Sequence, residues 1–138
     1  DPFITGNGTQ SRDMAHVSDV VEANIFSMLN HEELSGKVYD VGTGENISLN
    51  DIKNIVLSVF PGVLFKNKNS RKGEVQETRA NILPLTEKGW KPKIQINKGI
   101  KTCFLELKKE IEGEENETFK SSTGRHNDGT PKESLRTE

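Results

Sequence analysis

Hydrophobic residues recur with helical spacing in several stretches of this chain. Asp19 stands at the spacing of a capping box from Glu22, and an apolar stripe follows it on a predicted helix. A second helix is predicted to begin at the cap signature Ser48-Leu-Asn-Asp51 and to end at Pro61-Gly62. The apolar residues that define these two helices are Val21, Ile25, Met28 and Leu29 in the first, and Leu49, Ile52, Val56, Val59 and Phe60 in the second.

Two further helices are predicted before the composition changes at residue 112. A short helix is predicted to be capped by Asn81 and to end at Gly89, before Trp90 and Pro92. A last helix is predicted to open at Asn97. Its apolar side is formed by Ile100, Phe104, Leu107 and Ile111.

The composition changes after Ile111. From Glu112 to Glu138, the large apolar residues are Phe119 and Leu135, and acidic residues outnumber basic ones. Such a segment buries too little surface to offset the entropy of ordering it. We therefore predict one folded domain over residues 1–111 and a disordered polar tail over residues 112–138.

Short runs of β-forming residues alternate with the helices. Residues 13–17 are predicted as a strand, with Met14 and His16 on one face. Lys37–Val41 follows Gly36 and is also rich in β-formers. Further strands are predicted at residues 63–66, as an edge strand, and 93–96. The pattern predicts an α/β fold with mixed short strands and about four helices.

Composition and charge exclude several classes of function. Apolar residues make up 31% of the chain, the formal net charge is −2 and the pI is about 6.0, so no global basic field attracts nucleic acid or an anionic membrane. Cys103 is the single cysteine, so no internal disulfide can form and a cytoplasmic location is expected. No apolar run approaches the ~18 residues of a membrane span. A start at Asp1 rather than Met indicates a fragment, natural or engineered, or a processed chain.

Gly42-Thr43-Gly44 lies between a predicted strand and a predicted helix, which is the context of a dinucleotide fingerprint. The third glycine of that fingerprint is replaced by Ile47, whose branched side chain would hinder close packing of helix and strand. The favoured interpretation is a tight turn that needs the conformational freedom of glycine. An anion at the N-terminus of the following helix remains an alternative.

Two arginines are candidates for binding a diphosphate. Arg12 follows a glycine-rich turn at the mouth of the first predicted strand, and Arg71 lies in a basic loop before Gly73. A guanidinium carries a permanent charge and paired, planar donors that suit phosphate oxygens. An isolated surface arginine is more often only a solvated charge, so spacing alone leaves both roles open.

Four short motifs, in this order and spacing, resemble the extended short-chain dehydrogenase/reductase superfamily. Within it, the chain is similar to the C-terminal, substrate-binding part of the NAD-dependent nucleotide-sugar epimerases and dehydratases of the UDP-glucose 4-epimerase kind. The similarity covers about residues 1–107. The motifs are Gly6-Asn-Gly-Thr-Gln-Ser-Arg-Asp13, Arg71-Lys-Gly-Glu-Val75, Lys88-Gly-Trp-Lys-Pro92 and Asn97-Lys-Gly-Ile100.

The resemblance implies roles for individual residues. It implies that Arg12 and Arg71 both contact the diphosphate of a nucleoside-diphosphate sugar, with Glu74 as a further substrate-binding residue. The basic loop Asn67–Gly73 would close one side of the pocket. The chain departs from the family pattern at Lys72, where Pro is usual, and at Asn81 and Ser18, where Asp is common. These departures leave the exact substrate open.

Other titratable residues offer weaker candidates. His16 could serve as a general base, but no partner residue stands at a recognisable spacing, so a packed strand histidine is the favoured interpretation. A metal site is not expected, because Cys103 and the scattered His16, His31 and His126 do not form a zinc-binding set.

The sequence lacks the catalytic pair and the cofactor-binding motif of such an enzyme. The family uses a Tyr-x-x-x-Lys pair, but Tyr39 is the single tyrosine here and Thr43 stands four positions later. The resemblance implies that NAD is bound by an N-terminal Rossmann half, whose sheet would take up Lys37–Val41. Without that sheet, exposed strand edges predict that the isolated piece is marginally stable or pairs with another chain.

Two functional hypotheses follow. The first is a sugar-nucleotide-binding segment of an NAD-dependent epimerase/dehydratase, inactive on its own, with the Rossmann half and a second copy of the protein as candidate partners. The second is a non-catalytic binding or interaction module derived from such an enzyme. The base, the sugar, the reaction outcome and the oligomeric state stay open.

Overall fold

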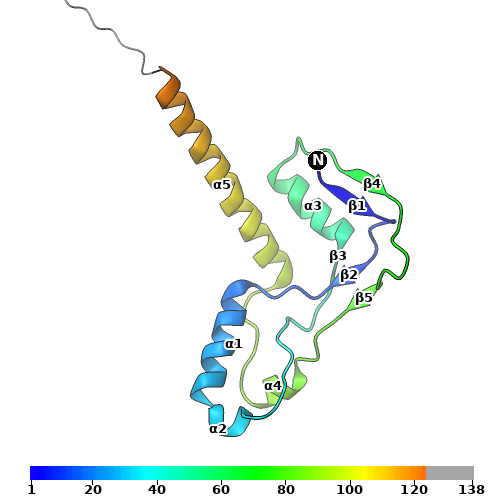
Figure 1. The fold of residues 1–138 in the computed structure, drawn as a ribbon, viewed down its shortest axis with the longest axis vertical. Helices are drawn as coiled ribbons and strands as arrows, with labels where there is room; N and C mark the ends of the chain where they lie inside the picture. Colours follow the sequence, from blue (N-terminus) through cyan, green and yellow to red (C-terminus); the bar gives the residue numbers. More distant parts are fainter. Residues whose placement is uncertain (124–138) are drawn as a thin grey trace, which may run out of the picture.

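The structure of the protein is a computed structural model that describes residues 1–123, with side chains described through residue 113. The described residues form five helices and five short strands (Figure 1), which confirms the predicted α/β class. The helices are α1 (Val17–Leu29), α2 (His31–Leu34), α3 (Leu49–Val59), α4 (Leu83–Glu87) and α5 (Ile96–Thr123). The strands are β1 (Phe3–Thr5), β2 (Ser11–Arg12), β3 (Ile47–Ser48), β4 (Lys66–Lys68) and β5 (Glu77–Thr78).

The strands form two small sheets. In one, β1 and β4 pair in parallel. In the other, β2 lies between β3, to which it is antiparallel, and β5, to which it is parallel. Arg12 is paired with Ile47 on one side and with Thr78 on the other. The central strand of the larger sheet therefore carries the first candidate arginine.

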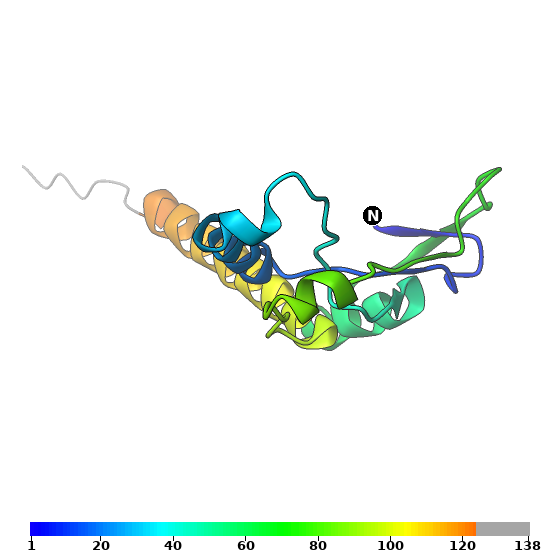
Figure 2. The ribbon, with the colours of Figure 1, turned by 90° about the horizontal axis from the view of Figure 1, so that it is seen from below.

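The predicted second helix is confirmed as α3, together with its cap. The amide of Asp51 donates to Ser48 Oγ at 3.1 Å, and Asp51 Oδ2 accepts from the Ser48 amide at 3.4 Å, which completes a capping box. Val56 and Val59 are buried on the predicted apolar side. Figure 2 shows α3 and the N-terminal part of α5 on the same side of the strands, where these two helices pack together.

The predicted cap of the first helix is wrong. α1 begins at Val17, and its N-cap is His16, whose Nδ1 accepts from the amide of Ser18 at 3.2 Å. Asp19 lies inside the first turn and is 2% exposed, with its carboxylate accepting from the amides of Lys93 at 3.0 Å and Ile94 at 3.1 Å. A buried carboxylate needs such donors, so Asp19 joins α1 to the segment before α5 instead of capping the helix.

Several predicted strands are absent or displaced. Residues 13–16 form no strand, because β2 ends at Arg12 and the following side chains serve a loop contact and the cap of α1. Lys37–Val41 has no strand partner within residues 1–123, and Val38 is 96% exposed. Residues 93–96 form no strand, since their amides at 93 and 94 bind Asp19. The edge strand predicted at 63–66 is found as β4, which overlaps it only at Lys66.

The apolar stripe predicted for α1 faces outward. Met28 is 75% exposed and Leu29 78%, and Val21 and Ile25 are about half exposed. The opposite face of the helix, with Ala23 and Phe26, packs instead into the core. That core consists of Ala23, Leu34, Leu85 and Trp90, with Phe26 and Tyr39 packed against it.

The short helix predicted after Asn81 is present as α4, and Gly89 ends it with a φ of 106°. Its predicted cap is wrong. The N-cap is Ile82 and makes no side-chain bond, while the amide of Asn81 donates to Asp40 Oδ2 at 3.2 Å. Asn81 therefore connects α4 to the segment after α2 rather than starting the helix.

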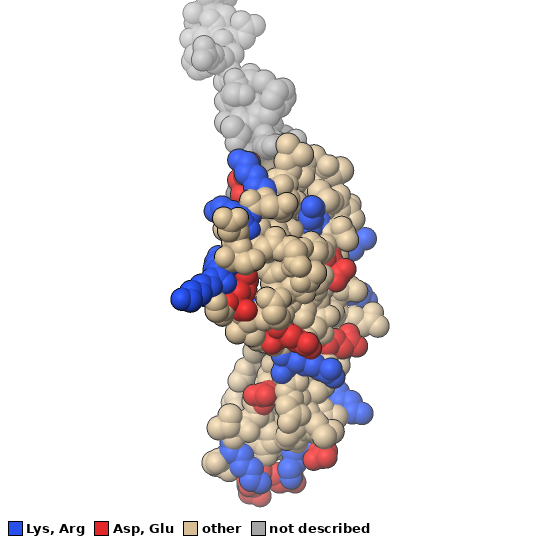
Figure 3. Space-filling model, turned by 90° about the vertical axis from the view of Figure 1, so that its right-hand side faces the viewer, with Lys and Arg blue, Asp and Glu red and all other residues tan. Residues whose placement is uncertain are grey.

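The last helix, α5, begins at Ile96 and continues through Thr123, past the predicted end of the domain at residue 111. It extends away from the rest of the fold in Figure 1. Residues 112–123 are therefore helical where a disordered tail is predicted, and residues 124–138 lie outside the described part of the chain. On the face seen in Figure 3, cationic and anionic side chains are interspersed, as the small net charge leads one to expect.

Candidate functional site

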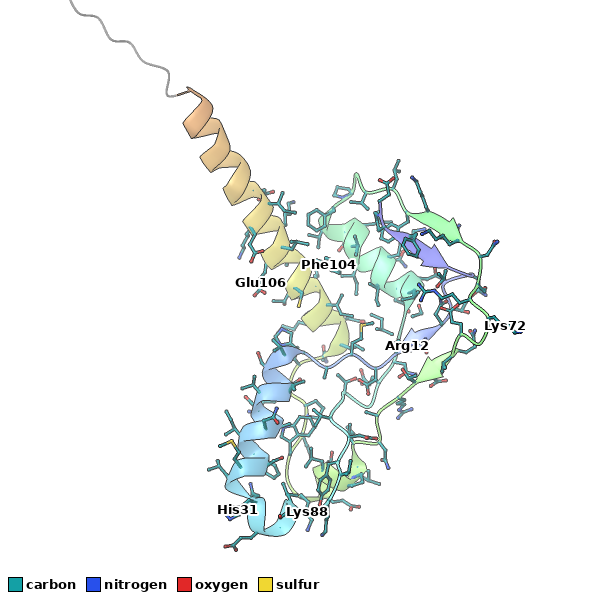
Figure 4. All side chains as sticks on the ribbon, in the orientation of Figure 1. Arg12, His31, Lys72, Lys88, Phe104 and Glu106 are labelled. Atoms are coloured by element: carbon teal, nitrogen blue, oxygen red, sulfur yellow. The ribbon has the colours of Figure 1, made fainter. Side chains whose placement is uncertain are left out.

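Arg12 is half-buried on the central strand β2, and backbone carbonyls hold its side chain. Nη1 donates to the carbonyl of Ser11 at 2.7 Å, and Nη2 donates to the carbonyl of Val75 at 2.8 Å. A guanidinium has five N–H donors, so others remain for an anion. Figure 4 places Arg12 at the three-stranded sheet, and Lys72 at the outer edge of the loop between β4 and β5.

Arg71 belongs to that loop and is exposed. Its carbonyl accepts from the amide of Glu74 at 3.2 Å, which closes a turn in which Gly73 has a φ of 78°. Its guanidinium has no hydrogen-bond partner among the described residues. Because Arg12 contacts Val75 at the end of the same motif, the loop of the second arginine is tied to the first. Convergence of the two guanidinium groups on one ligand stays a prediction.

Glu74 is turned toward the interior of the fold. Its Oε1 accepts from Thr5 Oγ1 at 3.0 Å and from Gln10 Nε2 at 3.2 Å. Gln10 is 4% exposed, and Nε2 also donates to the carbonyl of Thr5 at 2.8 Å. The carboxylate thus anchors the loop of Arg71 on the turn between β1 and β2. The sequence indicated a substrate contact for Glu74, and this anchoring role was missed.

An open hollow lies beside this anchor. It has a volume of about 540 Å³ and is bounded by the turn at residues 6–7, by residues 67–70 and by Gln76. Most of these side chains are neutral and polar, and Lys68 is the cation among them. Part of the loop predicted to close one side of the substrate pocket lines this hollow, together with the glycine-rich turn before Arg12. Arg12, Arg71 and Glu74 are not among the lining residues.

Asp13 joins the sheet to two distant loops, and sequence reasoning gave it no role. Oδ1 accepts from the amide of Thr43 at 2.8 Å and from its hydroxyl at 2.7 Å. Oδ2 accepts from the amides of Gly44 at 2.9 Å and Ala80 at 3.3 Å. We call these four contacts the Asp13 clasp. The pairing of an acidic residue after Arg12 with a distant Gly-x-Gly loop is the sequence signal that could have indicated it.

The clasp also controls the ionisation of Asp13. Burial alone would raise the pKa of the carboxyl group, because it disfavours the charged form. Hydrogen bonds from the Thr43 hydroxyl and from the amides of Thr43, Gly44 and Ala80 outweigh that effect and hold the pKa below its usual value. Asp13 is therefore a carboxylate at neutral pH.

The glycine loop does not fit a dinucleotide. The amides of Thr43 and Gly44, which would have to face a pyrophosphate, donate to Asp13 instead. Where a Cβ on Gly42 would stand, Ala80 Cβ is in steric conflict and Asp13 Oδ2 is 2.7 Å away, so the close approach at this glycine is made by the protein itself. Gly44 has a φ of 73°. The loop therefore needs the conformational freedom of glycine at Gly44, but it is not a strand-to-helix turn, because no strand precedes it and β3 separates it from α3.

The remaining candidates from the sequence, His16 and Cys103, belong to no metal-binding group among the described residues. His16 is half-buried at the N-cap of α1, not on a strand, and its Nδ1 accepts from an amide. Within the described residues, no group of three or more His, Cys, Asp or Glu side chains could hold a metal ion. Cys103 is a free, exposed cysteine. Within residues 1–123, no helix is both long and apolar enough to span a bilayer.

Comparisons with known proteins show related sequences and folds. The sequence profile of the NAD-dependent epimerase/dehydratase family matches residues 1–42. A relative from Methanocaldococcus jannaschii that bears the name of a UDP-glucose 4-epimerase is 33% identical over 102 residues, covering 72% of this chain and 32% of the relative. The UDP-glucuronate 4-epimerase of Thermodesulfobacterium geofontis is 32% identical over 113 residues, covering 79% of this chain and 34% of that protein.

A solved structure shows the same fold. The crystal structure of UDP-glucose 4-epimerase with UDP-glucose from Thermotoga maritima matches with a TM-score of 0.69 and 26% identity, over 80% of this chain and 36% of that one. The chain thus spans about a third of the length of the curated relatives it matches. By its sequence and its fold, the chain belongs to the NAD-dependent epimerase/dehydratase family of the extended short-chain dehydrogenase/reductase superfamily.

Proposed function

We propose that this chain is the sugar-nucleotide-binding segment of an NAD-dependent epimerase/dehydratase that acts on a nucleoside-diphosphate sugar. The observation that carries the proposal is the setting of Arg12. Carbonyl oxygens of Ser11 and Val75 hold its guanidinium on the central strand, and the second of these belongs to the motif of Arg71. A fixed guanidinium loses less freedom when it binds a phosphate, so it binds more tightly.

The proposed ligand contacts are those of a diphosphate and its neighbouring groups. Arg12 and Arg71 bind the diphosphate, since each offers charged N–H donors to phosphate oxygens. Glu74 supports the loop of Arg71 through Oε1, and its Oε2 is proposed to accept from a ligand hydroxyl. The hollow beside residues 67–70 receives the part of the nucleotide sugar that extends past the diphosphate.

NAD and the catalytic pair are proposed to come from an N-terminal Rossmann half. Support comes from the length of the relatives, from the lack of a Tyr-x-x-x-Lys pair at Tyr39, and from the glycine loop, whose amides bind Asp13. On this proposal the segment has no activity by itself. The setting is the cytoplasm, where Cys103 would remain reduced.

The surface for that half is proposed to be the apolar stripe of α1 together with Lys37–Val41. The stripe runs along the helix through Val21, Ile25, Met28 and Leu29, all exposed. Large contiguous apolar surfaces are rare on soluble proteins unless a partner covers them. The extended, unpaired segment with Val38 has the composition of a strand, and a sheet edge would satisfy its backbone groups. A second copy of the protein remains a further candidate partner.

The test is calorimetric titration of the full-length protein that contains this segment with UDP, GDP, CDP and dTDP. Arg12→Ala and Arg71→Ala are each expected to weaken binding of the preferred nucleotide by ~1.5–3 kcal/mol, the usual size of a lost charged hydrogen bond. Lys88→Ala is the control: this cation sits on the far side of the fold from Arg12 in Figure 4 and pairs with Glu33 at 3.3 Å. Unchanged affinity in both arginine variants would contradict the assignment.

A second measurement separates the enzyme from a derived binding module. Mass spectrometry of the purified full-length protein under native conditions is expected to show bound NAD, and incubation with UDP-sugars is expected to change the configuration of the sugar or eliminate water from it. Nucleotide binding with neither NAD nor any conversion would favour the non-catalytic module.

A further inference from the structure

We propose that Asp13 is a positioning residue for the diphosphate site, and that the Asp13 clasp holds the strand of Arg12 in its binding geometry before a ligand arrives. The inference rests on the proposed function of Arg12. It adds a residue that touches no ligand and acts through the neighbouring arginine. A positioning residue of this kind reduces the conformational entropy that the arginine loses when it binds a ligand, because the side chain is already fixed.

The sheet around Arg12 is small. β2, β3 and β5 are two residues long each, and Arg12 occupies the last pair on both sides. Such a ladder has few hydrogen bonds of its own to keep the strands aligned. The clasp begins at the next residue, where the amide of Asp13 also donates to the carbonyl of Thr78 at 3.0 Å.

The loops that the clasp holds lead to both neighbours of β2. Thr43 and Gly44 lie just before β3, and Ala80 lies just after β5. One carboxylate therefore holds β3 and β5, the two neighbours of β2, next to the C-terminal end of β2. If the clasp opens, β5 can shift relative to β2, and the carbonyl of Val75 that orients the guanidinium shifts with it.

The negative charge of Asp13 lies close to the proposed diphosphate site. Asp13 is an anion directly after the residue proposed to bind a diphosphate, so simple charge repulsion would make its removal improve binding. If the clasp positions Arg12, removing the charge of Asp13 instead weakens diphosphate binding. In Asp13→Asn, one oxygen is replaced by an NH2 group that faces the donating amides of Gly44 and Ala80, so those contacts are lost and the arginine loosens. The two effects can be told apart by direction alone.

The experiment is a double-mutant cycle on UDP binding by the full-length protein, with the wild type, Asp13→Asn, Arg12→Ala and the double variant. Asp13→Asn is expected to raise the Kd for UDP about tenfold in the wild-type background, the effect of losing one to two hydrogen bonds. In the Arg12→Ala background it is expected to change the Kd less than about twofold, since the residue through which it acts is gone.

Asp19→Asn is the matched control. It is the same chemical change at another carboxylate that accepts from backbone amides, but its contacts join α1 to the segment before α5 and leave the sheet of Arg12 untouched. It is expected to lower the melting temperature as Asp13→Asn does and to leave the Kd for UDP unchanged. All titrations are made at a temperature where circular dichroism shows each variant to be folded.

The outcomes separate the two proposals. If Arg12→Ala weakens UDP binding but Asp13→Asn does not, or if Asp13→Asn tightens it, the positioning role is wrong and the diphosphate site stands. An equal effect of Asp13→Asn in both backgrounds also overturns it, because the residue then acts through stability and not through Arg12. If the wild type binds none of UDP, GDP, CDP and dTDP, both proposals fall.

Discussion

Gly42→Ala tests how closely the glycine loop and the Asp13 clasp are packed. A Cβ at position 42 would collide with Ala80 Cβ and stand 2.7 Å from Asp13 Oδ2, distances that a real Cβ does not show. The φ of Gly42 is not in the left-handed region, so crowding and not backbone strain decides the outcome. Both crowding atoms belong to groups that the clasp holds together, so the added methyl pushes the clasp apart.

The magnitude follows from the two consequences of that methyl group. Overpacking a close contact costs about 1–3 kcal/mol. Each amide of the clasp that loses its acceptor while buried adds about 1 kcal/mol or more. We expect a total loss of about 2–4 kcal/mol in the free energy of unfolding, which corresponds to a decrease of about 1–2 M in the urea midpoint for a domain with an m value near 2 kcal/mol/M.

The assay is urea unfolding followed by the fluorescence of Trp90, the single tryptophan of the sequence and only 4% exposed. Gly62→Ala is the matched control, because a Cβ there meets nothing within 4 Å and the φ is ordinary. It should leave stability unchanged or raise it slightly by restricting the unfolded chain. Equal midpoints for Gly42→Ala and Gly62→Ala would refute the packing described for the clasp.

Further predictions concern pH, capping and the exposed helix face. Because the clasp lowers the pKa of Asp13, its stabilising effect is present above the ordinary aspartate pKa of about 4 and is lost as the pH falls through the folded-state value, so the difference in urea midpoint between wild type and Asp13→Asn should shrink on acidification. Ser48→Ala removes the cap of α3 and should lower the free energy of unfolding by about 1 kcal/mol, measured by urea titration. Met28→Glu should leave the unfolding midpoint of this chain nearly unchanged, since Met28 is 75% exposed, but should destabilise the full-length protein; equal effects in both would exclude a buried α1 face.

The sequence predicted best what is encoded locally. The cap at Ser48 and the periodicity of Val56 and Val59 identify α3 because each signal lies within a few residues of the helix. The sequence placed Arg12 just before a strand predicted at residues 13–17, whereas Arg12 lies on β2, which ends at that residue. Periodicity also identified the apolar residues that lie along one face of α1. It does not show whether that face is covered by this chain or by another one.

What sequence reasoning missed depends on contacts between distant residues. Asp19 has the spacing of a cap, but the amides of Lys93 and Ile94 bind its carboxylate, and a residue 74 positions away leaves no local signal. The clasp of Asp13 was missed for the same reason. Lys37–Val41 has strand composition, yet a strand needs a neighbour, and residues 1–123 supply none.

The pairing of the strands has a consequence for how this chain folds. β1 pairs with β4, and β2 pairs with both β3 and β5, so each pairing joins residues brought together across long loops. Closing such loops costs entropy before any ladder bond is gained, which makes non-local pairings slow to form. We expect α3 to form early and both sheets to form late and together. Pulse-labelled hydrogen exchange during refolding would test this order, with amides of α3 expected to gain protection before those of Arg12 and Lys68.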